Sequence, residues 1–164
     1  MLRWLHSKKG MTFVELVVVM AVMSILASVA MPMLRVSVKR AKEMELKRSL
    51  REMRDAVDRY KKLYEENRIT REAGGSGYPK TLDVLVEGVE ITNTAAAKPG
   101  EVQLPTRVRL LRKIPVDPMT GSAEWGLRSN EDDPESRIWG GQDVFDVYSL
   151  DDGTALDGTK YSDW

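Results

Sequence analysis

The sequence contains no cysteine and a single histidine, His6, among its 164 residues. Without cysteine the chain forms no disulfide bonds and has no thiol chemistry. Beyond His6 neither residue type occurs, which excludes Ser-His-Asp and Cys-His nucleophilic sites and ordinary zinc sites from that part of the chain. A hydrolase that uses two carboxylates stays compatible with the composition, because it needs only Asp or Glu in a cleft.

The sequence also lacks an excess of either charge, with 25 basic and 25 acidic residues. Nothing in this balance indicates a nucleic-acid partner or an acidic substrate. A nucleotide-binding P-loop is absent too, because the glycine-rich stretch at 74–77 has no Lys-Ser/Thr after it. The length fits one domain with a modest core, and no internal repeat argues for two.

One long hydrophobic run is present near the N-terminus, from Phe13 to Leu34, and between Leu16 and Met31 its only polar residues are two serines. This span matches the roughly 20 residues that a membrane helix requires. Basic residues before the run predict a cytoplasmic N-terminus, although further basic residues after it weaken that signal. A secretory signal peptide is the rival interpretation, but the run is long and lacks a good small-residue cleavage site near Ala30.

A single carboxylate, Glu15, stands at the head of this run. An ionised side chain in a membrane helix costs on the order of 2.5 to 3.5 kcal/mol on insertion scales. The simple interpretation is that Glu15 lies near the interface and extends its carboxylate to water. The alternative is a cation from another subunit: a cut after Gly10 would give Met11 a free ammonium, and a neighbour's ammonium would neutralise the carboxylate. Such a pair would penalise wrong registers, because either charge left alone is costly.

The N-terminal residues resemble the class III signal of type IV pilins and type II secretion pseudopilins, on the motif Lys8, Lys9, Gly10, Met11, Thr12, Phe13, Glu15 and Leu16, followed by the apolar run and Pro32. The resemblance implies that a membrane-embedded prepilin peptidase cuts between Gly10 and Met11 and methylates the new N-terminus. It also implies that Glu15 directs subunit assembly. Met11 departs from the phenylalanine that is commoner at the new N-terminus.

Residues 35–67 are rich in charged residues and Leu and contain neither Gly nor Pro. Within them an apolar stripe is spaced four, three, four, three and four residues apart, which predicts an amphipathic helix continuous with the membrane segment. We expect the stripe to pack on the chain's own domain rather than to form a free coiled coil, because it covers only about three heptads. Its members are Leu46, Leu50, Met53, Val57, Tyr60 and Tyr64.

Beyond residue 67 the helical pattern stops at a Gly- and Pro-containing loop. A short helix is predicted between Thr81, its N-cap, and Gly88. We expect an exposed connection over residues 90–103 and two strands over residues 122–128 and 143–150. The predicted fold class is therefore α+β, with a long N-terminal helix packed on a small antiparallel sheet, as in type IV pilin-like proteins.

The order of these segments is most similar to the major pseudopilin of type II secretion systems. The similar stretches are Tyr78-Pro79, residues 114–121, residues 146–153 and the final Asp163-Trp164. Two departures stand out: residues 129–142 are long and acidic for that family, and the Ser-Leu-Asp-Asp-Gly loop is one residue short.

The tail from residue 149 alternates Asp with Gly and Ser, which supplies the hard oxygen ligands that calcium prefers. Asp-Gly pairs are also ordinary turn formers, and the spacing does not match an EF-hand. The resemblance implies a calcium ion in this loop. The ligands that it implies are the Leu150 carbonyl and the carboxylates of Asp152, Asp157 and Asp163, with Asp151 as an alternate.

The sequence thus predicts a leader at 1–10, a membrane and filament-core helix at 11–34, a stem at 35–67 and a periplasmic globular part at 68–164. The resemblance implies an inner-membrane, non-enzymatic subunit that polymerises with itself as a head-to-tail filament. It implies minor pseudopilins, prepilin peptidase, a platform protein and an assembly ATPase as partners. The alternatives are a type IV pilin, a competence-type pseudopilin, or a membrane-anchored hydrolase that uses the tail carboxylates.

Overall fold

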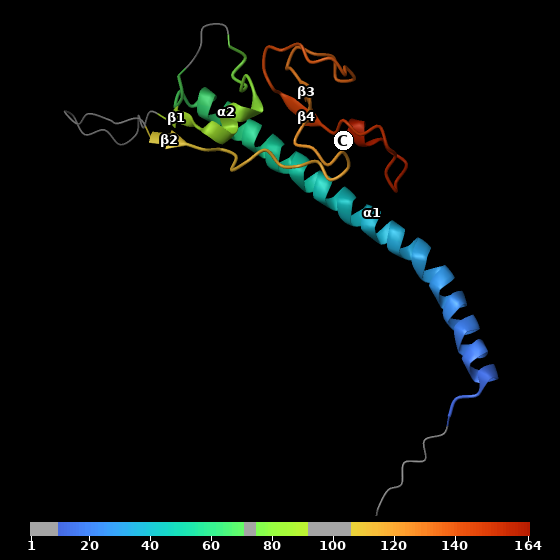
Figure 1. Ribbon diagram of the computed structural model, residues 1–164. Helices are drawn as coiled ribbons and strands as arrows, with labels where there is room; N and C mark the ends of the chain where they lie inside the picture. Colours follow the sequence, from blue (N-terminus) through green and yellow to red (C-terminus); the bar gives the residue numbers. More distant parts are fainter. Residues whose placement is uncertain (1–9, 71–74, 92–105) are drawn as a thin grey trace, which may run out of the picture. The chain divides into compact units, whose positions relative to one another are not determined.

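The structure, a computed structural model, describes residues 10–70, 75–91 and 106–164 (Figure 1). It divides into two compact units, Met1–Arg40 and Ala41–Trp164. The described elements confirm the predicted α+β class: a long helix is followed by short antiparallel strand pairs. In chain order they are α1 (Phe13–Glu65), α2 (Leu82–Glu87), β1 (Val89–Ile91), β2 (Thr106–Val108), β3 (Gly126–Arg128), β4 (Asp146–Tyr148) and the 3-10 turn η1 (Tyr161–Asp163).

Helix α1 is a single element of 53 residues and runs unbroken through Pro32. Proline has no N–H, so the Ser28 carbonyl loses its helical donor there. The predicted apolar stripe is confirmed as the buried face of the second unit. Four of its members are almost fully buried: Leu46 (0 % exposed), Leu50 (2 %), Met53 (0 %) and Val57 (1 %). Because this stripe packs within its own domain, the coiled-coil alternative is wrong for these residues.

The predicted short helix is confirmed as α2, which follows Thr81 and ends at Gly88. Gly88 has a φ of 92°, a conformation that a residue with a Cβ rarely adopts. The chain then enters β1, whose Val89 lies opposite Val108 of β2 in an antiparallel pair. The expected connection over 90–103 is therefore wrong at its start, where residues 90 and 91 belong to a strand; residues 92–105 lie outside the described residues.

The strands predicted on either side of residues 129–142 are confirmed as an antiparallel pair, β3 and β4, in which Gly126 lies opposite Tyr148. Both strands are shorter than predicted. The predicted first strand began at Ser122, but Ser122 precedes β3 and belongs to a turn held by the buried Asp117, whose backbone N–H donates to the Ser122 carbonyl at 2.8 Å. A Cβ on Gly126 would overlap the Tyr148 ring, so this strand position requires glycine.

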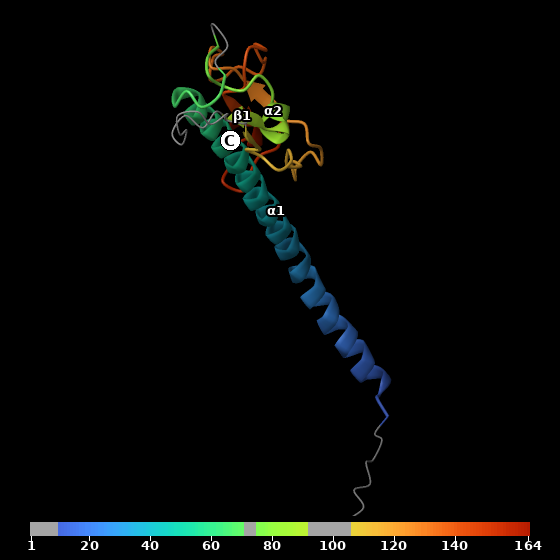
Figure 2. The same cartoon turned by 90° about the vertical axis from the view of Figure 1, so that its left-hand side faces the viewer.

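Two strand pairs and α2 gather along the C-terminal half of α1 (Figures 1 and 2). The core lies between them and consists of the α1 stripe, α2 and the segment around β4. Trp125, just before β3, also belongs to the core, and its indole N–H donates to the Pro115 carbonyl at 2.9 Å. Its buried members from outside α1 include Leu82, Leu85, Leu111, Trp125, Val144, Val147, Ala155 and Tyr161.

Candidate functional site

The predicted processing site lies just before α1, in a segment without regular secondary structure. Gly10 and Met11 are both exposed, and Met11 has 61 % of its surface accessible. A Cβ built on Gly10 would meet nothing within 4 Å. The fold of the described residues therefore does not require glycine at this position. A requirement for glycine would have to come from a partner that binds this segment.

The first turn of α1 has a capping arrangement that our sequence interpretation missed. The Glu15 N–H donates to the Thr12 hydroxyl at 3.2 Å, and the Leu16 N–H donates to the Thr12 carbonyl at 3.1 Å. Thr12 is thus the N-cap, and Glu15 stands at the third helical position. The signal was present in the sequence, because Thr-x-x-Glu before an apolar run is a capping-box pattern.

The N-terminal part of α1 presents apolar side chains on all sides, and it is long and apolar enough to cross a membrane. Its two serines satisfy their hydroxyls within the helix: Ser24 donates to the Met20 carbonyl at 2.8 Å and Ser28 donates to the Ile25 carbonyl at 2.9 Å. No polar side chain in this stretch then needs water, apart from the Glu15 carboxylate, which has no cationic partner among the described residues.

The predicted metal ligands lie along the tail that follows β4. Two of their carboxylates make local turns: Asp151 Oδ1 accepts the Gly153 N–H at 2.6 Å, and Asp157 Oδ1 accepts the Thr159 hydroxyl at 2.6 Å and its N–H at 3.0 Å. The Thr159 hydrogen bonds hold the pKa of Asp157 below its usual value. Both carboxylates therefore have local turn-forming partners.

The third carboxylate, Asp152, forms an ion pair with Arg137 from the loop between β3 and β4, with an N–O distance of 2.6 Å. This hydrogen bond raises the pKa of Arg137 above its usual value. A second nitrogen of the same guanidinium donates to the Ser162 hydroxyl at 3.0 Å. Arg137 thus ties two parts of the tail to residues 129–142.

The described residues contain no group of three or more His, Cys, Asp or Glu side chains that could hold a metal ion. Asp163 lies in η1, and the exposed Leu150 follows β4. The carboxylates of Asp151 and Asp152, which follow Leu150, accept hydrogen bonds from Gly153 and Arg137. As arranged here, the expected ligand set does not fit a calcium ion. Calcium remains a prediction from the resemblance, and it would require Asp152 to exchange Arg137 for the metal.

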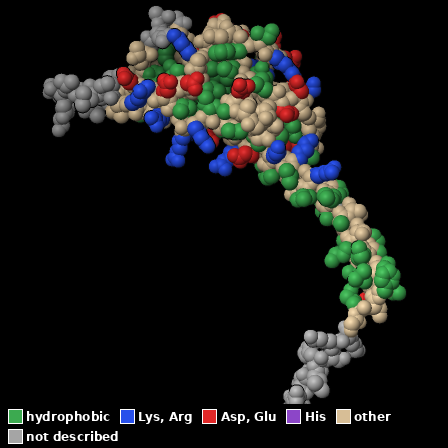
Figure 3. All heavy atoms as spheres, in the orientation of Figure 1, with side chains coloured by type: hydrophobic (Ala, Val, Ile, Leu, Met, Phe, Trp, Pro, Cys, Tyr) green, Lys and Arg blue, Asp and Glu red, His purple; other side chains and the backbone are tan. Residues whose placement is uncertain are grey.

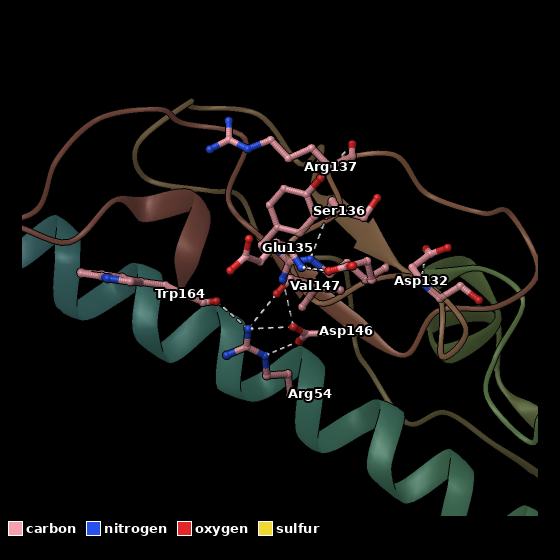
Figure 4. A network of polar contacts seen from close by, with 12 residues as sticks. Arg54, Asp132, Glu135, Ser136, Arg137, Asp146, Val147 and Trp164 are labelled. Carbon is pink, nitrogen blue, oxygen red and sulfur yellow. Dashed lines mark hydrogen bonds and ion pairs between the residues drawn. The ribbon is translucent and has the colours of Figure 1, made fainter.

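Two residues of α1 that the sequence interpretation overlooked hold the tail in place, Glu43 and Arg54. Figure 4 shows the contacts of Arg54. Arg54 Nε donates to Asp146 Oδ1 at 2.6 Å, and its Nη2 donates to the main-chain oxygens of Val147 at 3.0 Å and Trp164 at 2.6 Å. Asp146 also contacts Arg128 at 3.5 Å. One guanidinium thus connects α1, β4 and the end of the tail.

Comparison with known proteins gives one match, to the model of the prokaryotic N-terminal methylation motif over residues 5–31. No curated protein and no solved structure matches the chain. The matched residues include Gly10, Met11 and Glu15, together with most of the apolar part of α1. The motif supports a place in the type IV pilin-like superfamily. It is consistent with membrane anchoring, with processing by prepilin peptidase, and with a structural subunit rather than an enzyme.

Proposed function

We propose that the chain is a filament-forming pseudopilin subunit of a type II secretion-type system. The observation that carries this proposal is the methylation motif over residues 5–31, which runs directly into the membrane-length part of α1. In this proposal the prepilin peptidase cuts between Gly10 and Met11 and methylates Met11. The exposed apolar side chains of α1 then form the core of a helical homopolymer.

Glu15 has the assembly role in this proposal, and the magnitudes favour a partner for it. Burial of its charge in a membrane costs on the order of 2.5 to 3.5 kcal/mol. Its position in the first turn of α1 recovers only about 0.3 to 1 kcal/mol through the helix dipole. The ammonium of a neighbour's Met11 would offset the remainder, and it would do so only in the correct register.

The remaining partners follow from the same proposal. The chain has no P-loop, so the energy for assembly comes from a cytoplasmic ATPase acting through a platform protein of the inner membrane. The chain crosses that membrane once, and its second unit lies in the periplasm. Minor pseudopilins join the filament. A type IV pilin or a competence-type pseudopilin is the alternative, with the same N-terminal chemistry and a different export role.

The type II assignment is supported by the segments that are similar to the major pseudopilin, among them Tyr78-Pro79 and residues 146–153. Loss of protein secretion, without loss of surface pili or DNA uptake, in a strain that lacks this chain would separate it from the alternatives. A membrane-anchored hydrolase is the rival from another class. Detectable turnover that disappears on replacing a tail Asp would favour that hydrolase instead.

The assembly role is tested by Glu15→Ala in the full chain, expressed with a prepilin peptidase. Membrane insertion and cleavage should be unchanged, while the yield of filaments should fall strongly. Glu45→Ala is the matched control, because Glu45 is an exposed glutamate of the same helix outside the motif. Normal filaments from Glu15→Ala would contradict the pairing of Glu15 with a neighbour.

A further inference from the structure

A groove with a basic rim runs along the outer face of α1 in the second unit. Its α1 side chains are spaced three or four residues apart, so they share one face of the helix. Leu110 and Leu111, which follow β2, form the other side of the groove. Figure 3 shows many Lys and Arg side chains, with some Asp and Glu among them, along the lower edge of the second unit. The residues that line this basic groove are Arg48, Arg51, Glu52, Asp55, Arg59, Leu110, Leu111 and Arg112.

The arginines of the basic groove are not neutralised within the described chain. Arg48, Arg59 and Arg112 form no ion pair with any described residue. Arg51 donates only to the carbonyl of Lys47, at 3.2 Å. All four are exposed, and the groove has four arginines against two carboxylates. The groove therefore has a net positive charge, and its exposed guanidinium groups can contact an acidic partner.

Residues 129–142, the acidic loop, lie between β3 and β4 and are tied by several hydrogen bonds. Asp132 accepts the N–H groups of Ser129 at 2.7 Å and Gly140 at 3.0 Å, which closes the loop at its base. The Trp139 indole N–H donates to the Asp143 carbonyl at 2.7 Å, and Arg128 donates to the Ser136 carbonyl at 3.2 Å. Because these hydrogen bonds restrain the backbone before binding, we expect the loop to lose less entropy on binding than an unrestrained segment of the same length.

The outer side of the acidic loop has charges without cationic partners. Glu131, Asp133 and Glu135 are exposed, and none of them contacts a cation among the described residues. The two arginines nearest in sequence are already paired, Arg128 with Asp146 and Arg137 with Asp152. Beside these charges Ile138 has 82 % of its surface exposed, the highest value among the large hydrophobic residues that the structure describes.

The two surfaces lie on different sides of the second unit of one copy. The acidic loop, drawn in orange, lies beyond β3 and β4 on the side away from α1, whereas the basic groove lies along α1 itself (Figures 1 and 2). Each copy thus presents a positive groove at one side and a negative projection at another. Complementary surfaces at different places on one molecule give a heterologous contact, which builds an open helical filament when the rotation between copies does not close into a ring.

We propose that the acidic loop of one copy docks in the basic groove of a neighbouring copy, as a contact between the globular units of adjacent subunits. Glu131, Asp133 and Glu135 pair with the groove arginines, and Ile138 packs on Leu110, the partly buried leucine of the groove. This inference rests on the proposed filament function. It adds a second contact, outside the apolar helices, that selects the register of assembly through charge.

The absence of cysteine allows a direct test by disulfide cross-linking in the full chain. A chain with Glu135→Cys and Arg112→Cys, expressed with a prepilin peptidase and oxidised in membranes, should give a ladder of covalent oligomers. The control pairs Glu135→Cys with Glu124→Cys, because Glu124 is exposed and lies outside the groove. We expect about tenfold more cross-linked product from the groove pair than from the control.

Charge reversal tests whether the contact is electrostatic. In a cysteine-free background, Arg48→Glu with Arg112→Glu should reduce filament yield, and adding Glu131→Arg with Glu135→Arg should restore it. Raising the ionic strength should also weaken the wild-type contact, because salt screens exposed charges beyond about 8 Å at physiological concentration.

The outcomes separate this inference from the proposed function. Filaments that form with equal yield after charge reversal, or without the groove cross-link, would overturn the docking contact and leave the filament proposal standing. Cross-links that form without filaments and regardless of Glu15 would support the contact and contradict the filament. If the chain forms neither filaments nor cross-links, both the docking contact and the filament proposal are wrong.

Discussion

The phenol of Tyr161 donates a 2.9 Å hydrogen bond to Oε1 of Glu43, a residue 118 positions earlier in the chain. The same oxygen accepts the N–H of Leu156 at 2.9 Å. Glu43 is 9 % exposed and Tyr161 is 4 % exposed, so both side chains are buried. One carboxylate of α1 thereby fixes two points of the C-terminal tail.

Removal of this carboxylate should destabilise the second unit. Glu43→Ala leaves the Tyr161 hydroxyl and the Leu156 N–H without their acceptor, at a cost of about 1 to 3 kcal/mol for each group that stays buried. Glu43→Gln keeps an acceptor and should cost less. Denaturant unfolding of the full chain in detergent measures both. The control is Glu45→Ala, because Glu45 is exposed and its loss should change the free energy of unfolding by no more than about 0.5 kcal/mol. If Glu43→Ala and Glu45→Ala lower this free energy equally, Glu43 does not have the proposed role.

The same contact predicts a change of stability at high pH. Burial, followed by the hydrogen bond to Glu43, raises the pKa of Tyr161 from 10.0 to about 12. The unfolded state therefore releases this proton first, so the stabilisation is complete below pH 10 and is lost as the pH rises toward 12. Tyr161→Phe should show a flatter loss of stability over this window than the wild type. Parallel pH profiles for the two proteins would contradict the assignment.

Arg54 should contribute more to stability than a surface arginine. Arg54→Met removes hydrogen bonds to Asp146, Val147 and Trp164, and hydrogen bonds to charged groups contribute about 1.5 to 3 kcal/mol each where they are shielded. The Arg54 side chain is 37 % exposed, which places the expected loss at the low end of that range. Arg48→Met in the same helix is the control and should have a small effect. If Arg54→Met and Arg48→Met have the same unfolding midpoint, the hydrogen bonds of Arg54 do not contribute to the free energy of unfolding.

Much of the fold could be predicted because its signals are local and periodic. The spacing from Leu46 to Val57 identified the buried face of α1, and the Thr81 to Gly88 pattern identified α2. The pairing of β1 with β2 was missed, because strands of three residues hold too few side chains to show alternation.

The polar contacts were harder to predict, although one had a readable signal. Glu43 stands three residues before Leu46, in register with the apolar stripe, and a charged residue in that register has to find a buried partner. The pairing of Arg137 with Asp152 had no such signal, because it joins two loops whose approach depends on tertiary structure. The tail carboxylates were therefore interpreted by composition alone.

Calcium binding in the tail is testable against that ion pair. Metal and Arg137 would compete for Asp152, so a calcium site predicts that Arg137→Ala binds calcium more tightly than the wild type. It also predicts that a chelator lowers the unfolding temperature and the protease resistance of the wild-type chain. Asp152→Asn should abolish both effects. Calcium titration that leaves the unfolding temperature of every variant unchanged would contradict a calcium site.

The central claim is that the chain matures as a pilin-like subunit, and it is tested most directly by the mass and N-terminal sequence of the protein recovered from membranes that contain a prepilin peptidase. The account predicts a chain that begins at N-methylated Met11. A chain that still begins at Met1 would contradict the claim and indicate a simple membrane anchor. Cleavage beyond Ala30 would contradict it as well and indicate a secreted domain.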